Sequence, residues 1–286
     1  MSGIRNIFVL IKQVPDQSSK AGINPDGTID RAKAKRMLNP FDRYALQAAL
    51  HTKKTYGGKV TAISMGPPAA IEILLEALEH GVDKCYLLSD KRLAASDTLA
   101  TAYALHKVIK YVGEFDLIFC GLQTTDGDTA QVGPQIAERL NLPQVSYCED
   151  FKIEEDKKGK DEVTSSLLAK RVVEGGFEWV KMQIPGLITV ANSYHPLEYK
   201  TLRGARMVQH LLRNEEEKAN YIKTITLDDV KADPIKCGLK GSPTIVARTD
   251  KVSEIGGNCT IYQGLPAEQM VSNLVKSTNI LEFIKS

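Results

Sequence analysis

Two segments of the sequence carry small, hydroxyl-bearing residues in a way that suits phosphate binding, and the second of them also contains glycine. The first contains Ser96, Thr98 and Thr101, and the second runs from Gly121 to Gly133 and leads into a helical pattern. A helix start offers unpaired N–H groups and a partial positive charge to an anion, and glycine lets a ligand approach the backbone closely. Two such segments suit a diphosphate better than a monophosphate. The alternative interpretation is a pair of well-capped helices that bind no ligand.

Acidic residues in these segments need their own explanation, because a carboxylate beside a diphosphate is repulsive. We expect Asp126 and Asp128 either to cap the following helix or to hold a ribose hydroxyl. Ser96 is placed to cap the helix that the pattern predicts over residues 97–111. The sequence has no Gly-x-Gly-x-x-Gly fingerprint, no Gly-x-x-x-x-Gly-Lys-Ser/Thr loop and no Gly-x-Ser-x-Gly elbow.

The cysteines and histidines do not form a catalytic or metal-binding pattern. The five cysteines, at positions 85, 120, 148, 237 and 259, are odd in number, and none of them form a Cys-x-x-Cys pair. We therefore expect no disulfide, zinc site or iron–sulfur cluster. The five histidines are scattered along the chain. If the protein takes part in a reaction, we expect a bound cofactor to carry the chemistry.

The composition is that of an ordinary soluble globular protein. The chain has 286 residues, 43% of them hydrophobic and 25% charged, and a formal net charge of +2. The near-balanced charge argues against nucleic acid as the main partner. No stretch approaches the roughly 20 apolar residues of a transmembrane segment. The N-terminal residues lack the apolar core of a signal peptide, so we expect a cytoplasmic protein.

The elements that would position these segments alternate between strand and helix in the first half of the chain. Apolar strands are predicted over residues 6–12, 59–64, 84–88 and 115–120, with helices over 44–56, 69–80, 97–111 and 130–140. Apolar strands separated by helices indicate a doubly wound, mostly parallel α/β sheet of Rossmann-like type. The carboxyl ends of parallel strands share one edge of a sheet, so the loops that follow all four strands should converge there.

The pattern changes after residue 145. Strands over 145–154, 162–173 and 177–184, joined by polar or glycine turns, predict an antiparallel extension, and residues 188–191 are expected to return to the sheet. We predict an α/β nucleotide-binding domain with this extension over residues 1–191, followed by an irregular C-terminal region over 192–286. A terminal helix within 266–286 is expected either to fold back on its own domain or to pack on a partner chain.

The sequence resembles the β (small) subunit of electron-transfer flavoproteins over nearly the whole chain. Six pieces carry the resemblance through their order and spacing: residues 9–16 (VLIKQVPD), 38–50 (LNPFDRYALQAAL), 62–67 (AISMGP), 89–105, 116–134 (DLIFCGLQTTDGDTAQVGP) and 171–190 (RVVEGGFEWVKMQIPGLITV). The resemblance implies a heterodimer with a larger α subunit that holds a mobile FAD. The β subunit would hold a second adenine nucleotide, which is a structural AMP in single-flavin proteins and an FAD in the electron-bifurcating branch.

Two stretches resemble the bifurcating branch: residues 89–103 (SDKRLAASDTLATAY) and 126–133 (DGDTAQVG). In that branch the β-bound FAD takes a hydride from NADH. One electron then goes to a low-potential acceptor such as ferredoxin or flavodoxin. The other passes through the α-subunit FAD to a quinone-linked or acyl-CoA-dehydrogenase-type partner. Ala95 departs from the family pattern, which often has glycine there. The alternative is a non-bifurcating β subunit that binds AMP and docks the α-subunit flavin to dehydrogenases.

The resemblance also implies roles for individual residues. The set that would contact the cofactor is Leu10, Asn39, Pro40, Asp42, Met65 and Gly66 around the adenosine, Ser96, Asp97, Thr98 and Thr101 at the additional half of FAD, and Gly121, Gln123, Asp126, Gly127, Asp128, Thr129, Ala130, Gln131, Val132 and Gly133 at ribose and phosphates. Leu10 and Met65 are equally consistent with plain core residues. Leu202, Arg203 and Arg206 fall in the family's dehydrogenase-recognition loop, where the alternative is an exposed loop with solvated arginines.

Overall fold

The computed structural model describes residues 4–16, 35–158, 162–245 and 260–277. The chain divides into two compact units, Met1–Ile245 and Val246–Ser286. Within the second unit, helix α7 (Ala267–Ser277) is the described regular element. It falls within the helix predicted over residues 266–286, of which residues 278–286 lie outside the described part. The first unit contains every other element described below.

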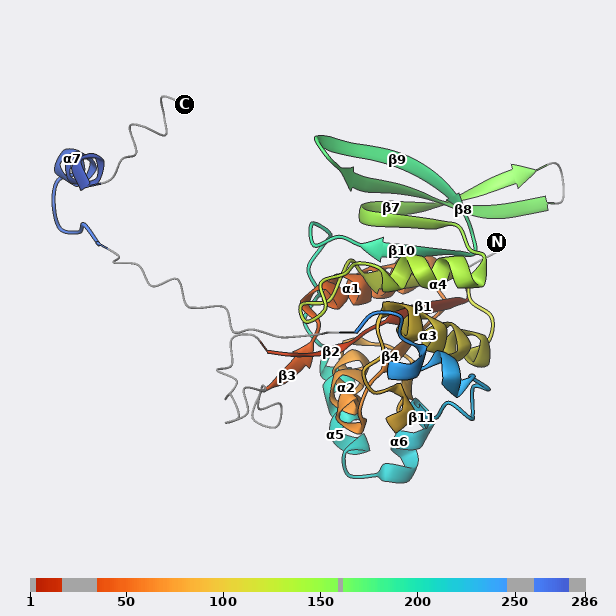
Figure 1. Cartoon of the computed structure of the whole chain (residues 1–286). Coiled ribbons are helices and arrows are strands. Elements are labelled where there is room, and N and C mark those ends of the chain that lie inside the picture. Colours follow the sequence, from red (N-terminus) through yellow and green to blue (C-terminus); the bar gives the residue numbers. More distant parts are fainter. Residues whose placement is uncertain (1–3, 17–34, 159–161, 246–259, 278–286) are drawn as a thin grey trace, which may run out of the picture. The chain divides into compact units, whose positions relative to one another are not determined.

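One large sheet forms the centre of the first unit (Figure 1). Its described strands lie in the order β11 (Ile222–Ile225), β5 (Lys84–Leu88), β4 (Lys59–Met65), β1 (Asn6–Leu10), β6 (Leu117–Gly121), β10 (Gly186–Val190), β7 (Gln144–Lys158), β8 (Glu162–Val173) and β9 (Gly176–Gln183). Neighbours from β11 to β7 are parallel. The β7–β8 and β8–β9 pairs are antiparallel. The predicted doubly wound parallel sheet with an antiparallel extension is therefore confirmed.

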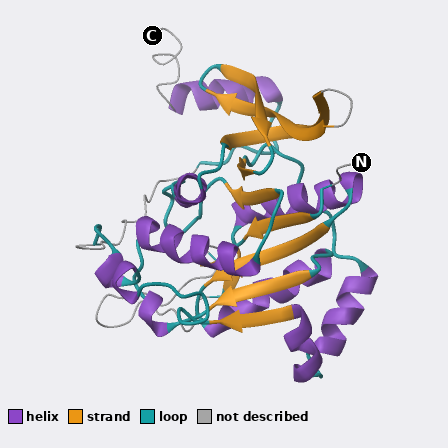
Figure 2. Cartoon of the chain, turned by 90° about the vertical axis from the view of Figure 1, so that its right-hand side faces the viewer, coloured by secondary structure: helices purple, strands orange, loops and turns teal. Residues whose placement is uncertain are grey.

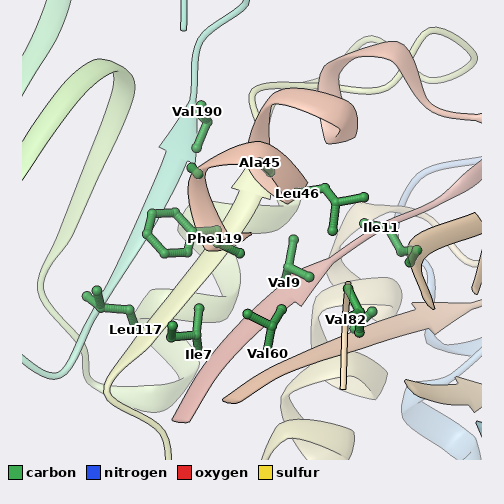
Figure 3. Packing of buried hydrophobic residues seen from close by; sticks show 14 of the residues in the cluster. Ile7, Val9, Ile11, Ala45, Leu46, Val60, Val82, Leu117, Phe119 and Val190 are labelled. Carbon is green, nitrogen blue, oxygen red and sulfur yellow. The ribbon is translucent and has the colours of Figure 1, made fainter. Parts of the chain in front are cut away.

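Helices cover both faces of the parallel strands (Figure 2). One core cluster joins α1 (Pro40–Tyr56), α2 (Ile71–His80) and α5 (Leu202–Leu211) to one face of the sheet, and a second joins α3 (Thr98–Val112) and α4 (Val132–Leu140) to the other. Along β1, Ile7 and Val9 belong to the first cluster, whereas Phe8 belongs to the second. This alternation explains why the strand is apolar throughout, because a sheet covered on both faces buries every side chain. Figure 3 shows the first cluster, with Val9 and Phe119 gathered beside α1.

Two of the helices begin or end at residue types that are typical of helix ends. α1 begins at Pro40, where a missing N–H and a fixed φ are tolerated. α2 is followed by Gly81, which has a φ of 112° and whose N–H bonds back to the helix, as is typical of a glycine that ends a helix. The described helices include none that is both long and apolar enough to span a membrane.

The prediction of an irregular region after residue 192 is wrong for residues up to Ile245. This part contains α5, α6 (Glu215–Tyr221) and β11, and β11 pairs in parallel with β5 at the edge of the main sheet. The first compact unit therefore extends to Ile245, past the division predicted at residue 191. These elements are short, and α6 buries none of its side chains, so hydrophobic periodicity gives little signal there. A small antiparallel pair, β2 (Gln13–Pro15) with β3 (Arg36–Leu38), was also not predicted.

Candidate functional site

The four loops predicted to converge do follow parallel strands that end at one edge of the sheet. β4 and β5 lie on one side of β1, whereas β6, which follows them in the chain, lies on the other side. The strand order therefore reverses between β1 and β6. In open α/β sheets a ligand crevice forms at the carboxyl edge at such a reversal. The residues after β1 and β6 are accordingly the first place to look for a binding site.

A buried polar network ties these two loops together at the start of α1. Asn39 is fully buried, and its side-chain amide donates to the carbonyl of Gln123 at 2.8 Å. The N–H of Thr125 donates to Asn39 Oδ1 at 3.3 Å. The backbone N–H of Lys12 donates to Asp42 Oδ2 at 2.7 Å. Asn39 and Asp42 thus hold the loop after β1 and the loop after β6 to the same helix start.

Asp42 sits in an unusual electrostatic position. Burial raises its pKa to about 7, against the lowering effect of hydrogen bonds from Asn39, Lys12 and Gly121 and of the Lys12 charge. A Cβ at Gly121 would overlap Asp42 and the backbone of Phe41. Glycine at position 121 is therefore required for α1 to approach the end of β6, which is a packing role rather than contact with a ligand.

Lys12 and Asp126 form an ion pair across the strand-order reversal. Lys12 Nζ lies 2.8 Å from the Asp126 carboxylate, and both side chains are partly exposed. Burial acts to raise the pKa of Asp126, but the hydrogen bond and charge of Lys12 lower it overall. Asp128 accepts a hydrogen bond from the side chain of Gln123. Neither carboxylate caps α4, so the capping interpretation of Asp126 and Asp128 is wrong. α4 begins at Val132, and its N-cap residue, Gln131, makes no side-chain capping bond.

The loop between β6 and α4 has a strained backbone. Asp128 and Ala130 have φ values of 53° and 55°, in the left-handed region that non-glycine residues rarely occupy. Ala95, in the loop before α3, has a φ of 59°. This conformation gives a physical reason for glycine in the family pattern at that position, since glycine adopts it without steric cost.

The start of α3 differs from the prediction by one residue. Asp97, not Ser96, is the N-cap, and its side chain accepts from the N–H of Ala100 at 3.0 Å. The Ser96 hydroxyl instead donates to the carbonyl of Leu93 at 2.8 Å. The Thr98 hydroxyl donates to Gln131 Oε1 at 2.9 Å, so the first residues of α3 and α4 are in direct contact. The two segments singled out in the sequence are therefore neighbours.

The remaining predicted cofactor residues take different positions. Leu10 is 6% exposed and belongs to the core cluster beneath α3 and α4. Met65 and Gly66, at the end of β4, are partly buried, as are Pro40 and Thr101. A Cβ at Gly133 would lie 2.7 Å from Cys120 Sγ and 2.9 Å from Thr189 Cγ2, so this glycine lets α4 pack on the sheet. Five of the predicted ribose and phosphate residues are exposed, namely Asp126, Gly127, Asp128, Thr129 and Gln131. Four more are partly buried, namely Gly121, Gln123, Ala130 and Val132.

The predicted docking residues lie apart from this edge. Leu202 is the first residue of α5 and is 69% exposed, and Arg203 and Arg206 lie on the same helix. The segment is therefore a helix, not a loop. α5 begins beside the carboxyl end of α2, where the N–H of Thr201 donates to the carbonyl of Glu79 at 3.1 Å.

Three residues with polar contacts at the site were not predicted. Lys12 directly follows β1, and its position after an apolar strand is a signal that could have identified it. Ser242 and Thr244 both bond to Asp97, at 2.8 and 2.7 Å. No local pattern marks them, because their partner lies about 145 residues earlier in the chain.

Comparisons with known proteins agree with this arrangement. The family model described as the electron transfer flavoprotein domain matches residues 26–228. The electron transfer flavoprotein subunit beta of Thermoanaerobacterium thermosaccharolyticum is 41% identical, over 96% of this chain and 98% of its own length. Protein FixA of Azorhizobium caulinodans is 37% identical, with 97% and 96% covered. The caffeyl-CoA reductase-Etf complex subunit CarD of Acetobacterium woodii is 38% identical, with 94% and 96% covered.

The three relatives match over nearly the full length of both chains in each comparison. The residues that the family model matches include the loop after β6 and the start of α3. The chain therefore belongs to the electron transfer flavoprotein family, as a relative of its β subunits.

Proposed function

We propose that this chain is the β subunit of an electron-bifurcating electron transfer flavoprotein and binds FAD at the carboxyl edge of its parallel sheet. The observation that carries the proposal is the contact between the two helix starts, where Thr98 bonds to Gln131 at 2.9 Å. Two adjacent helix starts, of which that of α3 is capped by Asp97 and that of α4 has no side-chain cap, suit the diphosphate of FAD better than the single phosphate of AMP. α4 has no side-chain cap, which leaves its first N–H groups available to an anion.

The side chains at this edge would bind and orient the cofactor. The Asn39–Asp42 network holds the loops after β1 and β6, which would contact the adenosine and the phosphates, and the Lys12 ammonium pairs with Asp126 in the loop after β6. The exposed backbone of residues 126–130 would follow the ribose and phosphates. A flavin bound there would supply the redox chemistry, which we propose to be hydride acceptance from NADH.

The proposed partners follow from the family and its bifurcating branch. We propose a heterodimer with the α subunit, in the cytoplasm. One electron would pass to ferredoxin or flavodoxin, and the other, through the α-subunit FAD, to a quinone-linked or acyl-CoA-dehydrogenase-type partner. Similarity to CarD, which is named as part of a caffeyl-CoA reductase-Etf complex, supports a partner of the acyl-CoA type. Leu202, Arg203 and Arg206 would contact this partner, since Leu202 is apolar and exposed.

We place the α subunit on the antiparallel extension and on α7. β9 is the last strand of the sheet, so one of its edges is unpaired within the described residues. It exposes Phe177 by 57% and Trp179 by 50%. An exposed aromatic edge strand favours pairing with another chain. Val271 and Leu274 on α7 are also exposed within their own unit and offer a second apolar surface.

Nucleotide extraction from the purified heterodimer tests the proposal. We expect two FAD and no AMP per heterodimer, and rapid flavin reduction by NADH. One FAD together with one AMP, and no reduction by NADH, would instead identify the second candidate, a β subunit with a structural AMP. The Asn39–Asp42 network is compatible with that candidate, because AMP also has the adenosine and the phosphate that the loops held by this network would contact.

A further inference from the structure

The segment from Gly238 to Thr244 is fastened to the loop that begins α3. The N–H of Asp97 donates to Ser242 Oγ at 2.8 Å. The Thr244 hydroxyl and N–H donate to Asp97 Oδ2 at 2.7 and 3.1 Å. The N–H of Gly238 donates to the Ser96 hydroxyl at 3.1 Å. We call Gly238, Ser242 and Thr244 the α3 clamp.

The clamp has a fixed geometry. Ser242 is 8% exposed, and its hydroxyl donates to the carbonyl of Gly238 at 2.7 Å while it accepts from Asp97. Gly238 has a φ of 60°, and a Cβ there would overlap the carbonyl of Arg92. The backbone at position 238 therefore approaches the loop more closely than any side chain would allow. The adjoining Cys237 is buried, so the segment is seated against the protein rather than lying loosely on it.

The clamp is linked through α3 to the start of α4. Asp97 is held by Ser242 and Thr244, and the next residue, Thr98, bonds to Gln131. The amide of Gln135 also donates to Thr98 Oγ1, at 3.4 Å. The first turn of α3 is thus held on one side by the clamp and on the other by α4. These bonds connect the clamp to the starts of both helices.

The clamp also fixes the charge of Asp97. Its carboxylate accepts from Ala100 at the helix start and from two donors of Thr244. Burial acts to raise the pKa of Asp97, but these hydrogen bonds lower it overall, so the group is ionised at neutral pH. A free carboxylate would repel a diphosphate. Both oxygens of Asp97 are held by donors of the protein itself: Oδ1 accepts from Ala100 and Oδ2 from Thr244. These bonds restrain the position of the negative charge.

We infer that Ser242 and Thr244 are positioning residues of the nucleotide site, which align the start of α3 with the start of α4 and select FAD over AMP. The inference rests on the proposed function, in which the additional half of FAD meets α3. AMP ends at one phosphate and would not need the aligned pair of helix starts. Loss of the clamp should therefore weaken the binding of FAD much more than the binding of AMP.

The experiment uses the heterodimer with its α-subunit flavin retained and the β site emptied. FAD and AMP are titrated separately into wild type, Ser242→Ala and Thr244→Val. We expect about a tenfold higher Kd for FAD in each variant. Each substitution removes a side-chain hydrogen bond to Asp97, and losses of this kind typically cost about that much. The Kd for AMP should change by less than about twofold. A change of that size is what a surface substitution away from the ligand commonly produces.

Two further variants separate positioning from general stability. Thr244→Ser keeps the hydroxyl and should restore FAD affinity to the wild-type value. Asn214→Ala removes the side-chain cap of α6, where Asn214 accepts from Glu217 at 3.1 Å, in a helix that contributes no residue to the α3 clamp. It should lower stability as a lost cap does, by about 1 kcal/mol, and leave the binding of both nucleotides unchanged.

The outcomes separate the two proposals. A wild-type β site that takes up AMP but no FAD overturns the proposed function and, with it, the role of the clamp. A wild-type site that binds FAD with the same affinity as Ser242→Ala and Thr244→Val overturns the clamp alone. Equal losses of FAD and AMP affinity also overturn it, because they would show a merely structural role. Selective loss of FAD affinity, rescued in Thr244→Ser, supports it.

Discussion

Replacing Asp42 with Asn should change how the stability of this protein depends on pH. Burial raises the pKa of Asp42 from the usual 3.8 to about 7, so between these values the folded protein holds a proton that the unfolded chain has released. The free energy of unfolding should therefore fall as the pH rises through this window and level off above it. Each pH unit corresponds to about 1.4 kcal/mol, which gives about 4 kcal/mol across the window as an upper bound.

Asn resembles the protonated Asp42 in shape and does not titrate. Urea unfolding of wild type and Asp42→Asn, followed by circular dichroism from pH 4 to pH 8, measures the difference directly. The stability of the variant relative to wild type should increase with pH up to about pH 7 and then stay constant. A difference that is the same at every pH would refute the assignment of a raised pKa to this buried carboxyl.

Asp97→Asn is the matched control, because the pKa of Asp97 is shifted in the opposite direction to that of Asp42. Hydrogen bonds lower the pKa of Asp97 overall, so its ionised form contributes stability above about pH 3.8 that is lost as the pH falls further. The difference between wild type and Asp97→Asn should be constant from pH 5 to pH 8. It should shrink only in more acidic solution. The two variants together test the sign of each shift.

Three further predictions concern the site and its surroundings. In titrations of the complex, Lys12→Met should weaken FAD binding by about fivefold, because it removes a positive charge beside the phosphate loop. Asp126→Asn should strengthen FAD binding by about fivefold, because it removes a negative charge there. Two changes of affinity in the same direction would contradict this electrostatic explanation. Gly238→Ala should lower the free energy of unfolding by about 2 kcal/mol or more, because φ is 60° and the methyl group has no space; unchanged urea midpoints would disprove this. Trp179 is the single tryptophan of the chain, and its fluorescence should shift to shorter wavelength when the α subunit binds. An unchanged emission maximum would exclude β9 from the interface.

Much of the fold could be predicted because the parallel strands are apolar on both faces. Residues such as Phe8 and Val9 point to opposite sides of β1, and both are buried, so a continuous apolar run indicates a sheet covered by helices. The position of β10 between β6 and β7 could not be predicted in the same way. The order of strands in the sequence does not say which two strands a later strand will lie between. β10 pairs with β6 on one side and with β7 on the other.

The candidate site was predicted in its location but not in its contacts. Ser96 and Asp97 are adjacent and both suit a helix cap, and only the backbone geometry of the folded loop selects Asp97. Asp126 bonds to Lys12 rather than to a helix start, which depends on two strands lying side by side. The α3 clamp depends on Ser242 and Thr244, which reach Asp97 from a distant part of the chain. Such long-range pairs are decided by packing, which single-sequence patterns do not contain.

The buried start of α1 has a consequence for the thermodynamics of binding. Asn39 and Asp42 hold the loops after β1 and β6 through hydrogen bonds that form within the protein alone. An incoming nucleotide therefore meets a surface whose conformational entropy has already been lost during folding. Ordering a flexible loop on binding would cost part of the interaction free energy, and a preorganised site avoids that cost. The part of the site that we propose for the nucleotide should accordingly hold its shape when no nucleotide is bound, so that affinity reflects contacts rather than rearrangement.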